Sequence, residues 1–242
     1  MPEDFFGADV APQYDAHLEE MGDEDVVEST ADFLVDHARG GAALELGIGT
    51  GRIALPLHRR GVPVHGIDLS AAMVAQLRAK PGAEGIRVTV GDFAHAHAPG
   101  TFRVAYLVFN TIGNLTSQDE QVACFCNVAE HLEPGGRFVI EVGVPDLQRL
   151  PPGTTIQPFT VTPSHLGFDE YDIARQGLVS HHYYFDGDRA DVRSIPFRYV
   201  WPAELDLMAR IAGMTLLERW ADWHRTPFTS KSRAHVSVWE KG

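Results

Sequence analysis

Cysteines and long apolar runs are scarce in this chain, and their scarcity excludes several classes of protein. The two cysteines, Cys124 and Cys126, lie one residue apart on a predicted helix, so they point to different faces and form neither a C-x-x-C site nor a metal pair. No apolar run approaches the length that spans a bilayer, and residues 1–4 lack the basic start of a signal peptide. We therefore expect a cytoplasmic protein with reduced cysteines and no metal site.

Positive charge is scarce as well. The formal net charge is −13, and no Lys or Arg precedes Arg39. Proteins that bind nucleic acid without sequence preference present Lys and Arg to the phosphates, and docking on an anionic membrane needs the same charge, so neither partner is expected. The 242 residues, of which 44% are hydrophobic, suffice for one large α/β domain with or without an insertion.

A glycine-rich turn organises what is present. An apolar run at residues 42–46 predicts a short buried strand, and Gly47, Gly49 and Gly51 follow it directly. Glycines allow positive φ and a close approach of the backbone to a ligand. Residues 53–57 then predict a helix, whose N-terminus brings backbone N–H groups to the same place.

The spacing of these glycines distinguishes between ligands. A dinucleotide site has G-x-G-x-x-G, but here Arg52 occupies the place of the third glycine of that pattern. Glu45, two residues before the first glycine, would repel a pyrophosphate and attract a cation. The turn therefore indicates a cationic nucleoside.

Four more apolar segments alternate with predicted helices, which predicts a parallel sheet with helices on both faces. The expected strands are residues 61–68, 86–90, 103–109 and 137–142, and residues 23–38 and 118–132 are among the expected helices. Ligands of such sheets bind outside the carboxyl ends of the strands. Asp68, Asp92 and Asn110 all fall at such ends.

Spacing also indicates individual roles. Asp68 lies about 20 residues beyond the first glycine, where a carboxylate binds ribose hydroxyls. Asp92 is placed to accept a hydrogen bond from an adenine amine. Met73 follows on the next helix, capped by Ser70, where it packs either against the adenine or in the core.

The character of the chain changes after the fifth strand. Residues 145–201 are rich in β-forming residues separated by Pro, Gly and Asp, which predicts an antiparallel insertion between a domain of residues 1–144 and its continuation at 202–242. An insertion at this point leaves the sheet from the ligand-binding edge, so we expect a cover over the active site. A contact in a homodimer is the alternative role.

Four motifs together carry a family resemblance: E-L-G-I-G-T-G-R at residues 45–52, G-I-D-L-S at 66–70, G-D-F at 91–93 and L-E-P-G-G-R at 132–137. Over residues 10–143 and 202–240 the chain resembles the class I S-adenosylmethionine (SAM)-dependent methyltransferases. The resemblance implies a doubly wound, Rossmann-like sheet of seven strands, the last antiparallel to the others, with SAM as cofactor. It implies these cofactor-binding residues: Tyr14, Glu45, Gly47, Gly49, Gly51, Arg52, Asp68, Leu69, Met73, Gly91, Asp92, Phe93, Phe109 and Asn110.

Within that family the chain is most similar to bacterial enzymes that dimethylate nucleotide-linked amino sugars. Those enzymes have a catalytic histidine in the segment after strand four, whereas this chain has Ile112-Gly113-Asn114, and an Asn side chain is no general base at neutral pH. The departure directs the search for catalytic residues to the insertion and neighbouring loops. His182 and Asn114 are the catalytic candidates, and the substrate-binding candidates are Asn114, Glu141, Tyr184, Tyr199 and Arg225.

The sequence thus predicts methyl transfer from SAM to the nitrogen or oxygen of a small-molecule acceptor, giving S-adenosylhomocysteine. Two alternatives remain open at this point. One is a nicotinamide-dependent oxidoreductase, which the glycine spacing and Glu45 disfavour. The other is a SAM-binding protein without catalytic activity, because no base is evident at the usual position.

Overall fold

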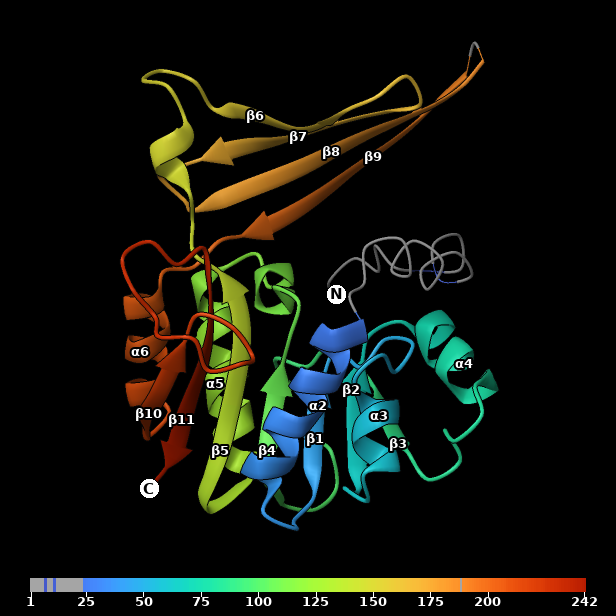
Figure 1. The fold of residues 1–242 in the computed structure, drawn as a ribbon, viewed down its shortest axis with the longest axis vertical. Coiled ribbons are helices and arrows are strands. Elements are labelled where there is room, and N and C mark those ends of the chain that lie inside the picture. The colour runs from blue at the N-terminus through green and yellow to red at the C-terminus, as the bar shows by residue number, and fades with distance from the viewer. Residues whose placement is uncertain (1–6, 8–10, 12–23, 188) are drawn as a thin grey trace.

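The computed structural model describes residues 7, 11, 24–187 and 189–242, and shows a layered body beneath a separate, smaller sheet (Figure 1). The helices are α2 (Glu24–Ala38), α3 (Ala54–Arg59), α4 (Ala71–Ala79), α5 (Gln118–His131) and α6 (Pro202–Ile211), with short 3₁₀ turns η1 (Thr111–Asn114) and η2 (Leu147–Arg149). The body strands are β1 (Ala43–Leu46), β2 (Val64–Asp68), β3 (Arg87–Val90), β4 (Phe102–Leu107), β5 (Leu132–Gly143), β10 (Met214–Trp220) and β11 (Ala234–Lys241).

The body contains the predicted seven-stranded sheet. Its strand order is β10-β11-β5-β4-β1-β2-β3. Strands β1 to β5 pair in parallel, whereas β11 is antiparallel to both β5 and β10. The doubly wound, Rossmann-like fold with a final antiparallel strand, predicted from the sequence, is therefore confirmed.

Two hydrophobic cores explain why the central strands are almost continuously apolar. Leu44 and Leu46 of β1 pack into one core with residues of α5 and α6, while Ala43 packs into the other with residues of α2 and α3. A sheet buried on both faces needs apolar side chains on both sides of each strand. Glu45, which shares the face of Ala43, is the exception in β1 and lies at the edge where the site forms.

One predicted boundary differs from the structure. Strand β5 begins directly after α5 and includes the Pro134-Gly135-Gly136 segment, which was expected to be a break before a strand at 137–142. Leu132 pairs with Phe102 of β4, and the register then shifts before pairing resumes at Arg137. The glycines are thus absorbed as an irregularity inside a longer strand.

A second sheet follows β5 and rises above the carboxyl ends of the body strands (Figure 1). Its four antiparallel strands are β6 (Ile156–Val161), β7 (His165–Asp172), β8 (Gly177–Asp186) and β9 (Arg189–Arg198). We refer to these four strands as the meander. Body and meander are joined at Arg198, whose guanidinium donates to Glu204 Oε1 at 2.7 Å, and at Gln121 Nε2, which donates to the Arg198 carbonyl at 3.3 Å.

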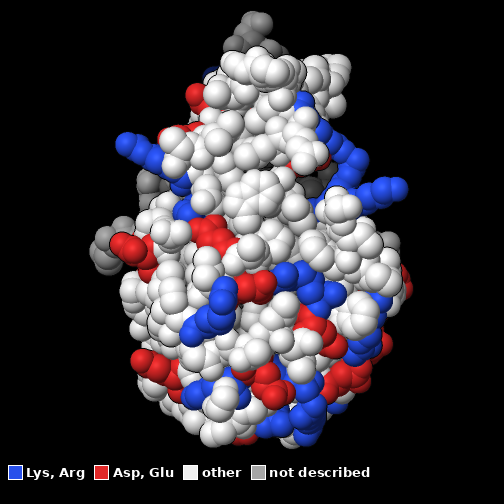
Figure 2. All heavy atoms as spheres, turned by 90° about the vertical axis from the view of Figure 1, so that its left-hand side faces the viewer, with Lys and Arg blue, Asp and Glu red and all other residues white. Residues whose placement is uncertain are grey.

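The surface carries charges of both signs in close mixture. Figure 2 shows the face with α6 and β10, on which acidic and basic atoms alternate over the body without a continuous basic area. Arg219 of β10, for example, pairs with Asp206 of α6 at 2.7 Å. None of the described helices is both long and apolar enough to cross a membrane.

Candidate functional site

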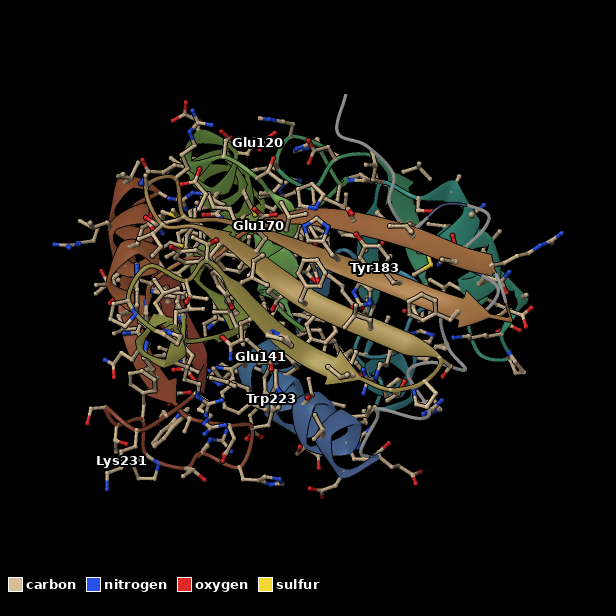
Figure 3. The ribbon with its side chains drawn as sticks, turned by 90° about the horizontal axis from the view of Figure 1, so that it is seen from above. Glu120, Glu141, Glu170, Tyr183, Trp223 and Lys231 are labelled. Carbon is tan, nitrogen blue, oxygen red and sulfur yellow. The ribbon has the colours of Figure 1, made fainter. Side chains whose placement is uncertain are left out.

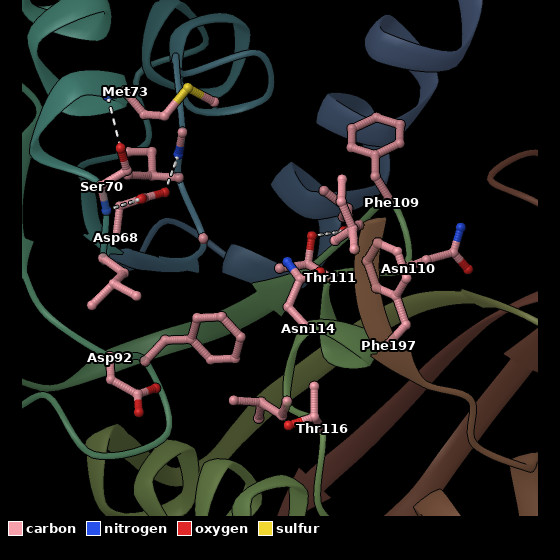
Figure 4. Close-up of a pocket in the computed structure, with 18 of the residues that line it drawn as sticks. Asp68, Ser70, Met73, Asp92, Phe109, Asn110, Thr111, Asn114, Thr116 and Phe197 are labelled. Atoms are coloured by element: carbon pink, nitrogen blue, oxygen red, sulfur yellow. Dashed lines mark hydrogen bonds between the residues drawn. The ribbon is translucent and has the colours of Figure 1, made fainter. Parts of the chain in front are cut away.

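A cavity of about 990 Å³ lies between the carboxyl ends of the body strands and the meander (Figure 4). Its volume is at the upper end of the usual range for small-molecule sites, and is sufficient for a nucleoside together with a second small molecule. The residues of the body that line it come from the turns after β1, β2, β3 and β4 and from the segments that follow them. They are Glu45, Gly47–Thr50, Arg52, Ile53, Asp68–Ser70, Met73, Asp92, Phe93, Val108–Thr111, Asn114–Thr116 and Glu120. Those in the meander are Phe159, Asp169, Ser180, His182 and Ile195–Phe197.

The glycine turn after β1 forms the floor of this cavity. Gly47 and Gly49 have φ values of +69° and +52°. A Cβ on Gly47 would meet Thr111 Cγ2 at 2.8 Å, so this position has room for glycine only. The turn is held by Asp68, whose carboxylate accepts hydrogen bonds from Gly49 N–H at 2.6 Å and from Ser70 N–H at 2.8 Å. The same carboxylate lines the cavity, so it links the turn to any ligand above it.

Glu45 is a buried acid beside this turn. Only 3% of its surface is exposed, and the Tyr106 hydroxyl donates a hydrogen bond to Glu45 Oε2 at 2.9 Å. Burial and the charge of Asp68 raise the pKa of Glu45 from its ordinary 4.5 to about 8, against hydrogen bonds from Tyr106 and Ala54 that lower it. In the protein alone the Glu45 carboxyl therefore favours its protonated form near neutral pH.

A strained turn after β4 forms the next part of the wall. Phe109 and Asn110 both adopt the left-handed conformation, with φ values of +54° and +60°. Two hydrogen bonds hold them there: Phe109 N–H donates to Glu141 Oε2 at 2.6 Å, and Asn110 Oδ1 accepts from Gly143 N–H at 2.6 Å. The Arg52 guanidinium lies 4.2 Å from the centre of the Phe109 ring, a cation–π contact.

The wall on the side of β2 and β3 combines apolar contact with one carboxylate. Met73 and Phe93 are buried and line the cavity. Asp92 lines the cavity as well, and its Oδ1 accepts a hydrogen bond from Ala94 N–H at 2.9 Å. A flat ring with an exocyclic amine suits such a wall, since Met and Phe contact its faces and a carboxylate accepts from its edge.

The meander closes the cavity from above with a polar centre and an apolar surround. Asp169 of β7 and Ser180 of β8 are cross-strand partners, and His182 follows on the same face of β8. Phe159 packs on His182 with ring centroids 5.2 Å apart, and Phe197 contributes from β9. The outer face of the meander carries Glu170 and Tyr183, seen from above in Figure 3.

Burial affects the ionisation of both central groups of the meander. It lowers the pKa of His182, and the nearby His165, Arg193 and His181 lower it further. It raises the pKa of Asp169, against the hydrogen bond from Ser180 and the proximity of His181. At neutral pH His182 is therefore a neutral imidazole that is able to accept a proton.

Most of the predicted site residues meet in this one cavity. They are Glu45, Gly47, Gly49, Arg52, Asp68, Leu69, Met73, Asp92, Phe93, Phe109 and Asn110, together with the catalytic candidates Asn114 and His182. Tyr14 lies outside the residues that the structure describes.

Two of the predicted cofactor-binding glycines are not among the residues that line the cavity, and their contact with the cofactor stays a prediction. Gly51 has a φ of +82°, and a Cβ there would meet Leu77 Cδ1 at 2.3 Å, so it lets the turn pack on α4. Gly91 has no room for a Cβ because Ala96 Cβ would lie 2.9 Å away. Both glycines shape the loops that present other residues.

Four predicted substrate residues are not among those that line the cavity. Glu141 lies behind Phe109 and accepts its N–H, and Arg225 donates to Asp36 of α2 at 2.7 Å. The Tyr184 ring stacks on that of His165, and the Tyr199 ring lies 6.1 Å from that of Tyr171. Their role as substrate contacts stays a prediction.

Several residues that line the cavity were not predicted from the sequence. Thr111, Glu120, Phe159, Asp169 and Phe197 all line the cavity. The only available signal for Asp169 was a polar side chain within a β-forming segment, and its place opposite Ser180 depends on a register that spans a turn. Within the described residues no group of three or more His, Cys, Asp or Glu side chains is arranged to hold a metal ion.

Comparisons with known proteins agree on one activity. A family model described as a methyltransferase domain matches residues 43–136. The cypemycin N-terminal methyltransferase of a Streptomyces species is 28% identical over an alignment of 212 residues, which covers 84% of this chain and 84% of that protein.

Solved structures extend the likeness over nearly the whole chain. The CcbJ methyltransferase from Streptomyces caelestis superposes with a TM-score of 0.84 at 36% sequence identity, covering 96% of both chains. The SAM-bound amino pentose methyltransferase CalS10 from Micromonospora echinaspora superposes with a TM-score of 0.73 over 95% of this chain and 96% of its own. At 21% identity the second likeness shows the fold alone.

Proposed function

The chain belongs to the class I SAM-dependent methyltransferases, and on that premise we propose that it methylates the nitrogen of a small-molecule amine. Its cofactor is SAM, which supplies a methyl group on a sulfonium sulfur. Because the chain belongs to this family, the nicotinamide-dependent oxidoreductase alternative is discarded. The protein is an enzyme.

The residues on the floor of the cavity fit SAM by their chemistry. SAM carries a sulfonium and an ammonium group and no phosphate, and the floor offers the carboxyl groups of Glu45, Asp68 and Asp92. In this proposal Glu45 holds the ammonium, Asp68 the ribose hydroxyls and Asp92 the adenine amine, while Gly47 allows the backbone to approach. The pocket binds the donor rigidly, because Asp68 is itself fixed by two backbone N–H groups.

The observation that carries an amine acceptor is the meander wall above the donor site. Its polar centre is a carboxylate, Asp169, with a neutral imidazole, His182. The carboxylate attracts an ammonium group, and the imidazole accepts the proton that an amine must lose before it attacks. Among the described lining residues Arg52 is the only cation, and it lies on the donor side over Phe109.

The remaining catalytic requirement is alignment. A neutral nitrogen needs little further activation when it is held in line with the methyl group at near-attack distance. Asn114 lines the cavity at the end of η1, between the floor and the meander, where its amide is available to orient the acceptor. The name of the 28% identical relative, an N-terminal methyltransferase, supports nitrogen as the acceptor atom.

A matched acceptor screen tests this proposal. Purified enzyme and SAM are incubated with pairs of molecules that differ only in bearing an amine or a hydroxyl on the same apolar body, and products are detected by mass. We expect methylation of the amine member of a pair. Methylation of hydroxyl members alone would refute nitrogen as the acceptor, and a reaction from which SAM is left out is the control.

Two further parts of the proposal concern the surroundings of the enzyme. Cys124 and Cys126 are free thiols, which supports the expected cytoplasmic location. Val161 and Val192 of the meander are 73% and 50% exposed, which supports a homodimer through this sheet. Light scattering at several protein concentrations measures directly whether the protein forms this homodimer.

A further inference from the structure

A continuous series of polar side chains runs from the cavity along the meander. Ser180 is the cross-strand partner of Asp169, and its hydroxyl acts to lower the pKa of the Asp169 carboxyl, against the larger effect of burial. His182 Nε2 lies 3.3 Å from Ser180 Oγ, and His182 Nδ1 lies 3.0 Å from His165 Nε2. Asp169, Ser180 and His182 line the cavity, whereas His165 lies beyond it and is partly exposed to solvent.

The distances in this series fit the proton positions that a relay needs. The Ser180 hydroxyl donates to His182 Nε2, so the neutral His182 ring carries its proton on Nδ1. His182 Nδ1–H then donates to His165 Nε2, and His165 carries its own proton on Nδ1. The two imidazole planes differ by 14° and their centroids are 5.2 Å apart, which fits an in-line N–H···N bond between nearly coplanar rings.

We propose that Asp169 is the ammonium subsite of the acceptor and that Ser180, His182 and His165 form a relay that carries the acceptor's proton to solvent. This inference rests on the proposed amine methylation and names the subsite and the proton path for it. The acceptor class is a basic amine that arrives as an ammonium ion, attached to a body that contacts Phe159 and Phe197.

Each step of the relay is a proton transfer that conserves charge. The N–H bond of the ammonium breaks and its proton passes to the Asp169 carboxylate. Asp169 passes a proton to Ser180 Oγ, whose own proton moves to His182 Nε2. The Nδ1 proton of His182 moves to His165 Nε2, and His165 Nδ1 releases its proton to water. These transfers start with His182 and His165 in their Nδ1–H tautomers and leave both as Nε2–H.

Methyl transfer follows on the neutral amine. The nitrogen lone pair forms the N–C bond while the S–C bond breaks and leaves its electron pair on sulfur. The product nitrogen is again cationic, so the Asp169 subsite serves substrate and product alike.

The surroundings of His182 favour passage of a proton over its retention. From β9, Arg193 lies opposite His182 in the sheet register, and Asp191 pairs with Arg193 at 3.0 Å. From β6, the Phe159 ring covers His182, reaching it because Gly167 opposite has no side chain. Burial of the ring and the nearby Arg193 cation destabilise an imidazolium at His182, whereas solvent beyond His165 accepts the proton readily.

Two variants of His165 separate a relay from a structural contact, because His165 does not line the cavity. With an amine acceptor from the screen and saturating SAM, we expect His165→Ala to lower kcat on the order of tenfold, a fraction of the general-base effect. The KM for SAM is expected to stay unchanged. Added imidazole should restore most of the kcat of His165→Ala, and His165→Gln, which fills the space and carries no proton, should stay slow without rescue.

A neighbouring histidine provides the matched control. His181 lies on the same strand, bonded to Ser194 at 2.8 Å and to Glu170 at 3.3 Å on the outer face, so His181→Gln should retain wild-type kcat. Asp169→Asn should raise the acceptor KM about tenfold or more for a basic amine. Thermal unfolding of each variant checks that the meander is intact.

The outcomes separate the relay from the proposed function. If the wild type methylates an amine and both His165 variants keep full activity, the relay is refuted, whereas the proposed amine methylation is not. A loss in His165→Ala that imidazole does not restore also overturns it, because a structural loss has no reason to respond to a proton carrier. An inactive wild type toward every amine overturns the proposed function itself.

Discussion

Replacing Glu45 with Gln should make the protein more stable at alkaline pH and weaker at binding SAM. Gln keeps the shape of Glu45 and an oxygen that accepts the Tyr106 hydroxyl, which lies 2.9 Å from Glu45 Oε2. The variant therefore removes the ionisation alone. Glu45 is 3% exposed, so its charge is not screened by solvent.

The sign and size of the stability effect follow from linkage. The folded protein keeps the Glu45 proton up to a pKa of about 8, whereas the unfolded chain loses it near 4.5, so stability falls as pH rises between these values. At about 1.4 kcal/mol per pH unit the upper limit is about 5 kcal/mol at pH 8, and relaxation around the charge leaves a few kcal/mol. Below about pH 5 wild type and variant should be equally stable.

Urea unfolding at a series of pH values measures this difference. The free energy of unfolding of Glu45→Gln minus that of wild type should be near zero at pH 5 and should rise by a few kcal/mol toward pH 8.5. Glu84→Gln, at an exposed position, is the matched control and should show no such rise. Parallel curves for Glu45→Gln and wild type would refute a buried, protonated Glu45.

Calorimetry of SAM binding tests the functional half of the same reasoning. A cation close to Glu45 favours the ionised carboxylate, so SAM binding should release a proton from wild type below about pH 8. Glu45→Gln should bind SAM about ten- to a hundredfold more weakly, the range of a charged hydrogen bond. Measuring both proteins at each pH cancels the ionisation of SAM itself. Equal affinities would mean that the ammonium does not contact Glu45.

Three other substitutions, in and around the proposed donor site, should change SAM binding or stability. Asp68→Asn should weaken SAM binding on the order of tenfold or more, since one backbone N–H of the turn loses its charged acceptor, and calorimetry measures the loss. Gly51→Ala should lower the free energy of unfolding by about 1–3 kcal/mol, because its Cβ would lie 2.3 Å from Leu77 Cδ1 at a φ of +82°; an unchanged urea midpoint would contradict the packing. Glu141→Ala should cost about 1–3 kcal/mol and weaken SAM binding as well, because the buried Phe109 N–H loses its acceptor; a stability loss with unchanged SAM affinity would separate this turn from the donor site.

The sequence could predict which residues meet at the floor of the cavity, because their placement depends on short-range signals. Gly47 follows β1, Asp68 ends β2 and Asp92 comes two residues after β3, and right-handed crossovers bring the ends of parallel strands to one edge of the sheet. The local chain alone thus places these residues together. The ionisation of Glu45 was not readable, because it depends on how deeply β1 is buried between two cores.

The acceptor side of the cavity depends on contacts between residues that are far apart in the chain, and the sequence alone does not reveal them. Asp169 meets Ser180 only in the observed register of β7 and β8, and a shift by one residue would turn His182 away from the cavity. Arg225 was predicted to approach the substrate, but its partner Asp36 lies 189 residues away in the chain, on α2. Such long-range pairs follow from the packing of the whole fold.

The SAM side and the acceptor side of the cavity belong to different sheets, which affects how the acceptor specificity of the enzyme can change. The proposed donor site is built on the body sheet, whereas Asp169, Ser180 and His182 belong to a sheet with its own hydrogen bonds. The two parts are held in place by Arg198, which is 5% exposed and bonds to Glu204, and by contact of Gly113 in η1 with β9. Side chains on the inner face of the meander can therefore change the acceptor without disturbing the binding of SAM, provided that this junction keeps the acceptor in line with the methyl group.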